Sequence, residues 1–320
     1  MWIVPESAIG GLVDDQSAFD AVEATFAAMA RDDAYNFPVV REALGEGRQY
    51  GFKSGLDRAG AQLGVKAGGY FPGNAAKGII NHQSTVFLFD PDTGILQAAV
   101  GGNLLTALRT AAASAISIAH LSRPESKVLG MVGAGHQSVF QMRAALRQRK
   151  FEKVVAWNYH PDMMDRLAAA VADAGLPFEE VSLEDLGAQA DVIITITSSP
   201  AASLMDAHVR PGTHVACMGT DTIGKQEVDP ALLARATVFT DEVAQSISIG
   251  EAQHAIAQGL ITADAITPIG AVINGTHKGR ASAEEVTLFD GTGVGLQDIA
   301  VASKAVELAR ANGSAIEVAL

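Results

Sequence analysis

The sequence predicts an α/β protein that combines a Rossmann-type doubly wound parallel sheet with a second, discontinuous α+β domain. Three observations support this fold class. After Pro124, short apolar strands alternate with helical stretches, which is typical of parallel sheets covered on both faces. The first of these strands runs into a glycine-containing turn. Before Pro124 the chain is instead rich in strands and ends in a long alanine-rich helix.

The domain boundary is expected near Ser122–Ser126, where this change of texture occurs. A chain of 320 residues is long enough for two hydrophobic cores. We place the discontinuous domain at 1–120 and 300–320 and the Rossmann domain at 121–299.

The first domain begins with a predicted helix over Ser17–Arg31, because apolar residues recur there at helical spacing. Three strands follow, and a turn at Asp90–Gly94 joins the last two. These strands are Val65–Tyr70, Thr85–Phe89 and Ile95–Val100. The alanine-rich helix Thr106–Leu121 completes the region, and its small residues lead us to expect that it is buried.

The second domain is predicted from short apolar runs separated by helical stretches. The expected strands are Val128–Val132, Val154–Trp157, Val192–Ile196, His214–Met218 and Val238–Thr240. A last helix over Gly295–Asn312 carries apolar residues for packing, and we expect it to return to the first domain.

Composition and charge exclude several classes of protein. The net charge of −13 argues against a nucleic-acid partner, because nothing would offset repulsion from phosphates. Cys217 is the single cysteine, which excludes an intramolecular disulfide and favours a reducing compartment. We expect Cys217 to be a small core residue. The N-terminus does not have the pattern of a signal peptide, no apolar stretch has the length of a membrane span, and no His or Cys spacing suggests a metal. These features predict a cytoplasmic protein without a membrane or metal partner.

A dinucleotide site is predicted where the strand Val128–Val132 ends. Gly133 permits a tight turn, Gly135 allows the backbone to approach a pyrophosphate, and Ser138 is small enough for close helix–strand packing. The helix that follows presents free N–H groups and the positive end of its dipole to phosphates. An ordinary tight βα turn is the alternative, but the strand before, the helix after and the second strand together favour the dinucleotide.

The choice between the two nicotinamide dinucleotides depends on the end of the second strand. An acidic residue there would favour NAD, and a nearby arginine would favour NADP. The chain has Asn158, followed by Tyr159 and His160. Because the arginine is absent, we favour NAD(H) over NADP(H), although the acidic residue is absent as well.

Several motifs resemble the ornithine cyclodeaminase/μ-crystallin family. The most specific is the block Leu104–Ala112 followed by Gly133–Gln137. Further matches are Gly64–Lys66, Phe71–Asn74, Phe89–Gly94, Gly219–Lys225 and Gly293–Asp298. The resemblance covers nearly the whole chain. It implies a substrate-binding and dimerisation role for the first domain, a homodimer, and a substrate pocket between the domains.

The resemblance also implies the type of reaction. The family moves a hydride between nicotinamide and the α-carbon of an amino acid or its imine, so we expect an NAD(P)H-dependent oxidoreductase that interconverts an α-imino acid and a small L-amino acid. The polar segment Asn81–Ser84 favours a small acyclic substrate, of the iminosuccinate-to-aspartate or alanine type. The alternatives are an ornithine cyclodeaminase and a non-catalytic ligand-binding protein of the μ-crystallin type.

By the same resemblance, Lys66 and Asp221 are expected to be catalytic. Arg41, Lys66, His82 and Arg109 are expected to bind substrate. A guanidinium such as that of Arg41 pairs bidentately with a carboxylate. Each residue also has a plainer interpretation. Arg41 could be a surface arginine, Lys66 an edge-strand lysine and His82 a histidine satisfied by its neighbours. Arg109 could form a buried structural ion pair, and Asp221 could be a loop aspartate. The residues expected to contact the cofactor are Asn81, Arg109, Gly133, Gly135, His136, Gln137, Asn158, Thr197, Met218 and Lys225.

Overall fold

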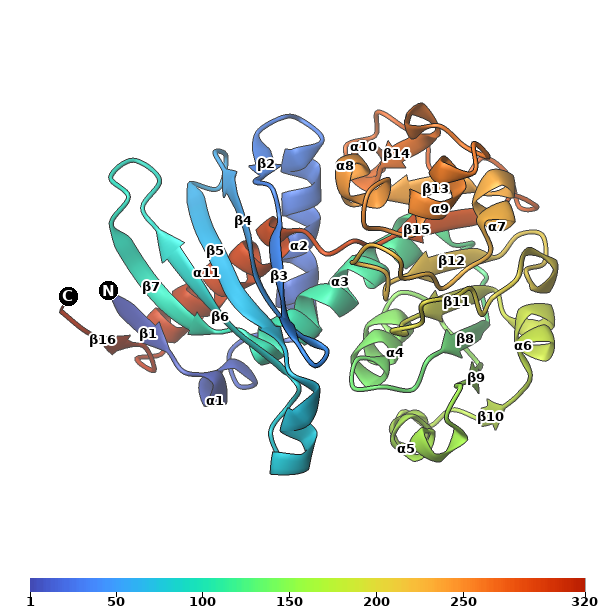
Figure 1. The fold of residues 1–320 in the computed structure, drawn as a ribbon, viewed down its shortest axis with the longest axis horizontal. Helices are drawn as coiled ribbons and strands as arrows, with labels where there is room; N and C mark the ends of the chain where they lie inside the picture. Colours follow the sequence, from blue (N-terminus) through green and yellow to red (C-terminus); the bar gives the residue numbers. More distant parts are fainter. Residues whose placement is uncertain (320) are drawn as a thin grey trace. The chain divides into compact units, whose positions relative to one another are not determined.

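The computed structural model describes residues 1–319. The chain divides into two compact units. Unit 1 contains Met1–Arg109 together with the C-terminal segment from Val294, and unit 2 contains Thr110–Gly293. The first boundary therefore falls inside the alanine-rich helix, after Arg109 and about three helical turns before the position at 120 expected from the sequence. Figure 1 labels the elements of both units.

Unit 1 is built around a mixed sheet of eight strands, in the order β16-β1-β7-β6-β5-β4-β2, with β3 paired to β4. Its elements are β1 (Trp2–Val4), α1 (Glu6–Ile9), α2 (Asp15–Met29), β2 (Ala34–Asn36), β3 (Val40–Gly45), β4 (Arg48–Asp57), β5 (Gln62–Tyr70), η1 (Pro72–Lys77), β6 (His82–Phe89), β7 (Leu96–Gly101), the start of α3 (Asn103–Leu121), α11 (Gly295–Ala311) and β16 (Ile316–Glu317).

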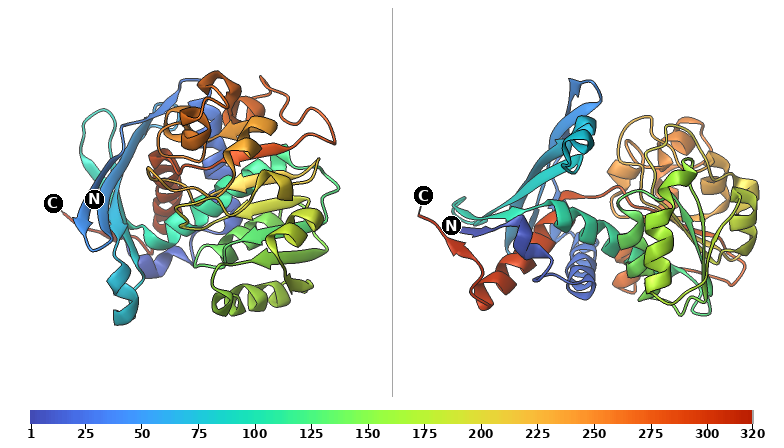
Figure 2. Two further views of the ribbon diagram at one scale, coloured as in Figure 1. Left: turned by 45° about the vertical axis from the view of Figure 1, so that its right-hand side comes forward. Right: turned by 90° about the horizontal axis from the view of Figure 1, so that it is seen from below.

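One face of this sheet is covered by helices. α11 packs on β4, β5 and β6 and also on α2. Figure 2 shows α2, in blue, and α11, in dark red, on the same side of the strands. The residues of the covered face are buried, as Val86, Leu88 and Val100 illustrate. The expectation that the C-terminal helix returns to the first domain is confirmed.

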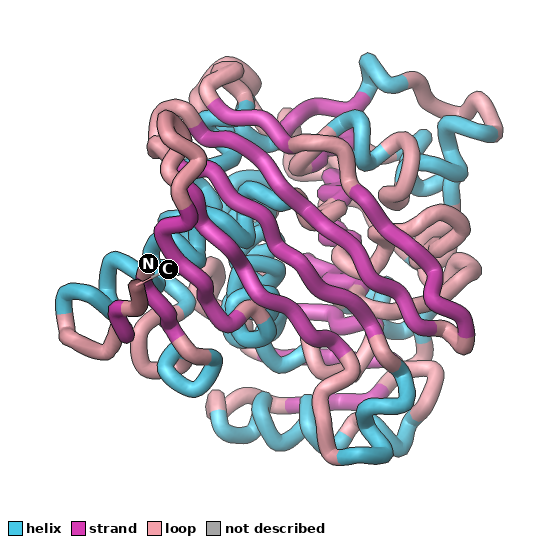
Figure 3. Tube along the Cα trace, turned by 60° about the vertical axis from the view of Figure 1, so that its left-hand side comes forward, coloured by secondary structure: helices cyan, strands magenta, loops and turns pink. Residues whose placement is uncertain are grey.

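The opposite face of the sheet carries apolar side chains that are only partly buried. Figure 3 looks onto this face, with the strands in front and the helices behind. Phe52 of β4 lies opposite Ala67 of β5, and Leu56 lies opposite Leu63, which in turn pairs with Phe89 of β6. The Phe52 side chain is 41% exposed. This apolar open face, made of every second residue of β4, β5 and β6, is unusual for a surface that faces only water.

Unit 2 contains a sheet of eight parallel strands in the order β10-β9-β8-β11-β12-β15-β13-β14. Its elements after the rest of α3 are β8 (Val128–Val132), α4 (Ser138–Leu146), β9 (Lys153–Trp157), η2 (Pro161–Met163), α5 (Asp165–Asp173), β10 (Phe178–Glu180), α6 (Leu183–Gln189), β11 (Val192–Thr195), η3 (Asp206–His208), β12 (His214–Cys217), α7 (Pro230–Arg235), β13 (Thr237–Thr240), α8 (Val243–Ser246), α9 (Ala252–Ala257), η4 (Ala263–Ala265), β14 (Ile266–Pro268), α10 (Ile269–Ile273) and β15 (Thr287–Asp290).

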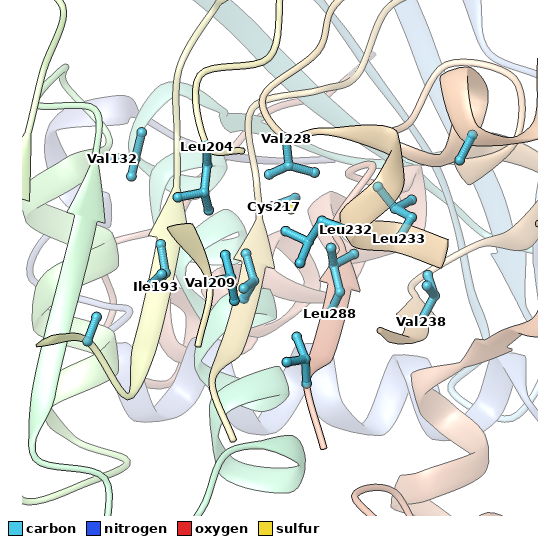
Figure 4. Packing of buried hydrophobic residues seen from close by; sticks show 14 of the residues in the cluster. Val132, Ile193, Leu204, Val209, Cys217, Val228, Leu232, Leu233, Val238 and Leu288 are labelled. Atoms are coloured by element: carbon cyan, nitrogen blue, oxygen red, sulfur yellow. The ribbon is translucent and has the colours of Figure 1, made fainter. Parts of the chain in front are cut away.

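The strand order reverses between β8 and β11, because the chain continues from β8 to β9 on one side and later returns to β11 on the other. In open α/β sheets, ligands bind outside the carboxyl ends of the strands at this kind of switch point. The strands pack on an apolar core, and Figure 4 shows part of it, with Val132, Ile193, Val209 and Leu288 among its members. Cys217 belongs to the same core, as expected, and burial raises the pKa of its thiol.

The helix α3 is long and apolar enough to span a membrane by length and composition alone. However, 83% of its apolar window is buried inside the protein. Its alanines pack in the core, as the small residues predicted. The carboxylate of Glu6 caps its first turn by accepting the N–H groups of Asn103 and Leu104. We therefore interpret α3 as a core helix.

Candidate functional site

A buried ionic network in unit 1 joins three elements. Asp298 lies in the first turn of α11, Lys66 on β5 and Arg109 on α3. The Oδ1 atom of Asp298 accepts the Lys66 Nζ at 3.0 Å and the Arg109 Nε at 3.1 Å. Lys66 Nζ also donates to Thr106 Oγ1 at 3.2 Å, and Arg109 Nη1 donates to Gln297 Oε1 at 3.1 Å. The network therefore brings two predicted site residues, Lys66 and Arg109, onto one carboxylate.

The charge of Asp298 is maintained by its partners. The side chain is completely buried, and burial acts to raise the pKa of the carboxyl. The positive charges of Arg109 and then Lys66 outweigh this effect and hold the pKa below its ordinary value. Asp298 is therefore ionised at neutral pH. Its other oxygen, Oδ2, is buried and has no hydrogen-bond partner within residues 1–319.

Two further side chains lie near this network. Lys53 of β4 lies directly opposite Lys66 in the β4–β5 pairing, and its positive charge also reaches Asp298. His82 is at the start of β6. Burial, followed by the charges of Lys66 and Arg109, lowers the pKa of His82 to about 4. The imidazole is thus neutral at pH 7, so one ring nitrogen can donate a hydrogen bond and the other can accept one.

Arg41 and Asn81 also belong to unit 1. Arg41 lies on β3, opposite Gly51 of β4, and is partly buried. Asn81 precedes β6 and holds the adjacent turn: its Oδ1 accepts the N–H of Ala75 at 2.9 Å, and its Nδ2 donates to Tyr70 Oη at 3.2 Å. The polar atoms of Asn81 therefore stabilise the segment around η1 in this structure.

The glycine turn of unit 2 connects β8 to α4. Gly133 has φ +110°, and a Cβ there would lie 2.6 Å from the Ile196 carbonyl oxygen. Any other residue would be strained at this position. A Cβ on Gly135 would instead meet nothing within 4 Å, so the glycine leaves open space beside the turn. Gly133 is thus required by the backbone conformation of the turn, whereas a cofactor role for the space beside Gly135 stays a prediction.

Asn158 helps to hold this turn from the end of β9. Its Oδ1 accepts the Ala134 N–H at 3.0 Å, and its Nδ2 donates to the His160 carbonyl oxygen at 2.7 Å. The side chain therefore fixes the backbone next to the two glycines.

The residues after the turn fit a dinucleotide. His136 is exposed, and burial, followed by the charge of Arg166, lowers the pKa of its imidazole. The Gln137 Oε1 atom is buried without a donor within residues 1–319, so a bound hydroxyl or amide would satisfy it. Together with the positive end of the α4 dipole and the space beside Gly135, this acceptor suits a pyrophosphate and its riboses.

The remaining predicted residues follow β11 and β12. Thr197 comes two residues after β11, and Met218 follows β12 immediately. Asp221 lies in the next loop and forms an ion pair with Lys225 at 2.8 Å. Lys225 Nζ also donates to the Gly219 carbonyl oxygen at 3.3 Å. All four residues lie at the carboxyl end of the parallel sheet.

Sequence reasoning missed the buried acidic residues. Asp298 closes one of the family motifs, but no role was assigned to it. In unit 2, burial raises the pKa of Glu227, and burial followed by the charge of Glu227 raises the pKa of Glu251 to about 8. Burial likewise raises the pKa of Asp290 to about 7. The signal in the sequence that could have revealed such residues is an acidic residue among apolar neighbours, as at Asp290 after Thr287–Phe289. Across residues 1–319, no group of three or more His, Cys, Asp or Glu side chains is arranged to hold a metal ion.

Comparison with known proteins defines the class. Residues 6–313 match the model of the ornithine cyclodeaminase/mu-crystallin family, and the chain belongs to this family. It is 63% identical over 319 residues to the iminosuccinate reductase of Paracoccus denitrificans, with 99% of each chain covered. The crystal structure of that enzyme in complex with NAD⁺ superimposes with a TM-score of 0.96, covering 100% of this chain and 99% of the other.

A more distant relative has the same fold. An archaeal alanine dehydrogenase, solved as a dimer with bound NAD, is 30% identical and has a TM-score of 0.93, with 100% and 99% of the two chains covered. The family and the fold class predicted from the sequence are confirmed. The comparisons also bear out the predicted activity class, an NAD-dependent oxidoreductase of the imine reductase type.

Proposed function

We propose that this chain reduces iminosuccinate to L-aspartate with NADH. The observation that carries the proposal is the buried network of Lys66, Arg109 and Asp298, in a chain with 63% identity along its whole length to an iminosuccinate reductase. The substrate is a dicarboxylate, and its two negative charges suit a sheet face that carries Lys53 beside Lys66.

Unit 1 supplies the groups that bind the substrate carboxylates. Lys66 and Arg109 are the binding cations, and Arg41 provides a third. Asp298 orients the first two, because one oxygen accepts both of their N–H groups. Holding two long side chains in one buried arrangement removes most of the entropy that they would otherwise lose when the substrate binds.

We further propose that the imidazole of His82, which is neutral at pH 7, hydrogen-bonds the second carboxylate. His82 lies near the cations Lys66, Arg109 and Lys53, and its neutral N–H can donate to a substrate carboxylate without adding another buried charge. In this proposal His82 contributes to binding and does not transfer a proton at neutral pH.

Unit 2 supplies the cofactor site and Asp221. Gly133, Gly135 and the start of α4 would hold the dinucleotide, and Asn158 would hold the turn in shape. When bound, NADH supplies a hydride to the α-carbon of the imine. The imine nitrogen, which bears its protons as an iminium, gains the electron pair of the C=N bond and then accepts one proton to become the ammonium of aspartate. Asp221 relays that proton to the nitrogen from the ammonium group of Lys225, with which it pairs at 2.8 Å.

A kinetic comparison tests the substrate. Iminosuccinate forms in solution from oxaloacetate and ammonium, and iminopropionate forms from pyruvate and ammonium. We expect NADH oxidation with the first pair at a kcat/KM at least about tenfold above the second, since a second carboxylate contact to a charged group contributes at least about 1.4 kcal/mol. Equal or higher activity with pyruvate would refute the proposal in favour of an alanine dehydrogenase.

We also propose that the protein is a cytoplasmic homodimer that associates through the open face of the sheet in unit 1. This face carries apolar side chains on neighbouring strands, and their exposure to water is unfavourable; they include Phe52, Leu56, Leu63 and Phe89. A second copy, which presents the same side chains, would bury them symmetrically. Light scattering should give the mass of two chains, and Phe52→Glu should shift the protein toward the mass of one. A wild-type monomer at micromolar concentration would refute the dimer.

A further inference from the structure

The carboxylate of Glu227 connects the ends of two neighbouring strands in unit 2. One oxygen, Oε1, accepts the Thr197 N–H at 2.6 Å and the Thr197 hydroxyl at 2.9 Å. The other, Oε2, accepts the Thr195 hydroxyl at 2.7 Å and the Gly219 N–H at 2.8 Å. Thr195 is the last residue of β11 and Thr197 lies in the loop that follows it, whereas Gly219 follows β12. One buried side chain therefore bonds both loops that leave these strands.

The fit around this carboxylate is close. Glu227 is 1% exposed, so water does not compete for its oxygens. A Cβ on Gly219 would lie 2.6 Å from Glu227 Oε1 and would also collide with the Thr197 carbonyl oxygen. The two loops can approach each other only because residue 219 has no side chain, and the carboxylate occupies the space between them.

A second buried carboxyl group, that of Glu251, holds Glu227 in place. Glu251 immediately precedes α9, and it accepts the N–H of Glu227 at 2.9 Å and the N–H of Val228 at 2.8 Å. It also accepts the Thr220 hydroxyl at 2.5 Å, in the loop that Glu227 bonds at Gly219. The two carboxyl groups thus hold consecutive residues of this loop, Glu227 at Gly219 and Glu251 at Thr220.

The same helix start anchors the remainder of this loop. Gln253 Oε1 accepts the Gly224 N–H at 2.9 Å, and His254 Nε2 lies 2.9 Å from the Lys225 carbonyl oxygen. Between these anchors the loop carries Asp221, which pairs with Lys225. The segment Gly219–Lys225 is therefore attached at its beginning by Glu227 and Glu251 and at its end by α9.

We propose that Glu227 is a positioning residue that sets the spacing between the loop at Thr197 and the loop Gly219–Lys225, and thereby places the nicotinamide end of the cofactor relative to Asp221. The inference rests on the proposed function in taking these two loops as the cofactor and acid positions. Its physical basis is preorganisation: four hydrogen bonds to one anion fix both loops before any ligand binds, so binding does not have to order them.

Two variants test the inference by different routes. Glu227→Gln keeps the shape of the side chain but presents an NH₂ group to loop N–H donors. Gly219→Ala keeps the charge and places a methyl group 2.2 Å from the Thr197 carbonyl oxygen and 2.6 Å from Glu227 Oε1, so it changes the spacing between the two loops directly. The control is Thr195→Val, which removes one hydroxyl donated from within β11 and leaves both loop N–H bonds intact. Glu227→Asp retains the charge and serves as the conservative variant.

The readout is NADH affinity, measured by cofactor fluorescence without any imino acid, together with the split between KM and kcat. We expect the Kd and the KM for NADH to rise at least about tenfold in both variants, as loss of a charged buried hydrogen bond predicts. The KM for the imine should stay within about twofold, Thr195→Val should resemble wild type, and Glu227→Asp should recover part of the affinity.

The inference is overturned if folded Glu227→Gln and Gly219→Ala both bind NADH within twofold of wild type. It is also overturned if KM for NADH and for the imine rise together in every variant, because a general loss of structure would do that. If Glu227→Gln does not accumulate as folded protein, Glu227→Asp, which keeps the charge and shortens the side chain, takes its place beside Gly219→Ala and should then also raise the Kd for NADH. Since NADH binding is measured without substrate, a wrong substrate assignment leaves this result unchanged.

Discussion

Replacing Asp298 by asparagine should damage both the stability of unit 1 and its binding of carboxylates. The change preserves shape and removes one negative charge. In the native protein, one Asp298 oxygen accepts Lys66 at 3.0 Å and Arg109 at 3.1 Å, and the side chain is fully buried. After the change, two buried cations share a neutral amide, of which one end is itself a donor.

The magnitude follows from the burial of all three groups. The Lys66 and Arg109 side chains are each only 8% exposed, so solvent screens them little. Removing one partner of a buried ion pair costs about 3–5 kcal/mol, because it leaves a desolvated charge without compensation. We therefore expect Asp298→Asn to lower the free energy of unfolding by about 3–5 kcal/mol in urea titrations.

A matched control separates charge from simple loss of a hydrogen bond. Thr106→Val removes the neutral partner of Lys66 and should cost only about 1 kcal/mol. A double-mutant cycle between Asp298→Asn and Lys66→Met should give a coupling energy above about 1 kcal/mol. If Asp298→Asn unfolds within 1 kcal/mol of wild type and keeps its kcat/KM, the network has neither the energetic nor the orienting role argued above.

Three further predictions follow from the geometry of unit 2. Gly135→Val should raise the Kd for NADH at least about tenfold, because it places a side chain where a pyrophosphate would lie. It should leave the melting temperature unchanged, because a Cβ at this position meets nothing within 4 Å. An unchanged affinity would exclude this turn as the cofactor site. Asp221→Asn should lower kcat about 100-fold or more with NADH affinity and stability preserved, and a wild-type kcat in rapid-mixing measurements would remove Asp221 from the chemistry. The pKa of Glu251 is about 8 in the folded protein, against an ordinary value of 4.5, so the folded state retains a proton that the unfolded chain releases. Its contribution to stability is therefore present at pH below about 4.5 and is lost as the pH rises toward about 8; Glu251→Gln should flatten the decline in unfolding free energy between pH 5 and 8, and an unchanged slope would contradict the raised pKa.

Much of the Rossmann unit could be predicted from the sequence because its signals are local. The strands β8, β9, β11, β12 and β13 are short apolar runs, and the predicted ranges agree with the observed ones to within one residue at each end. The turn at Gly133 was recognisable because a tight βα turn constrains the residue types nearby. The strand β15 was missed, since its four residues have no periodicity of their own and are held by β12 and β13 on either side.

The hairpin of β3 and β4 was missed for a different reason. Successive residues of β4 point alternately to the face that α11 covers and to the open face. Charged residues and glycines occur on both faces, so the sequence does not show a regular apolar and polar alternation. Lys53 is an example: it is buried although it carries a charge. Such a position is understandable only when its cross-strand neighbour Lys66 and the partner carboxylate are known.

The candidate site shows the same limit. Lys66 stood out locally as a charged residue in an apolar segment, and the family motif supplied its expected role. Its partner Asp298 is 232 positions away, and nothing in the local pattern connects the two. The role of Glu227 could not be predicted either, because its four donors lie on Thr195, Thr197 and Gly219. These residues meet Glu227 only after β11 and β12 have paired in the folded sheet.

The most direct test of the central claim follows a labelled hydride and a labelled nitrogen into the product. The protein is incubated with oxaloacetate, ¹⁵N-ammonium and NADH that carries deuterium at both C4 positions of the nicotinamide, and the products are examined by chiral chromatography and mass spectrometry. Reduction of iminosuccinate predicts L-aspartate that carries one deuterium at Cα and one ¹⁵N. Deuterated malate without nitrogen, or aspartate without deuterium, would contradict the account.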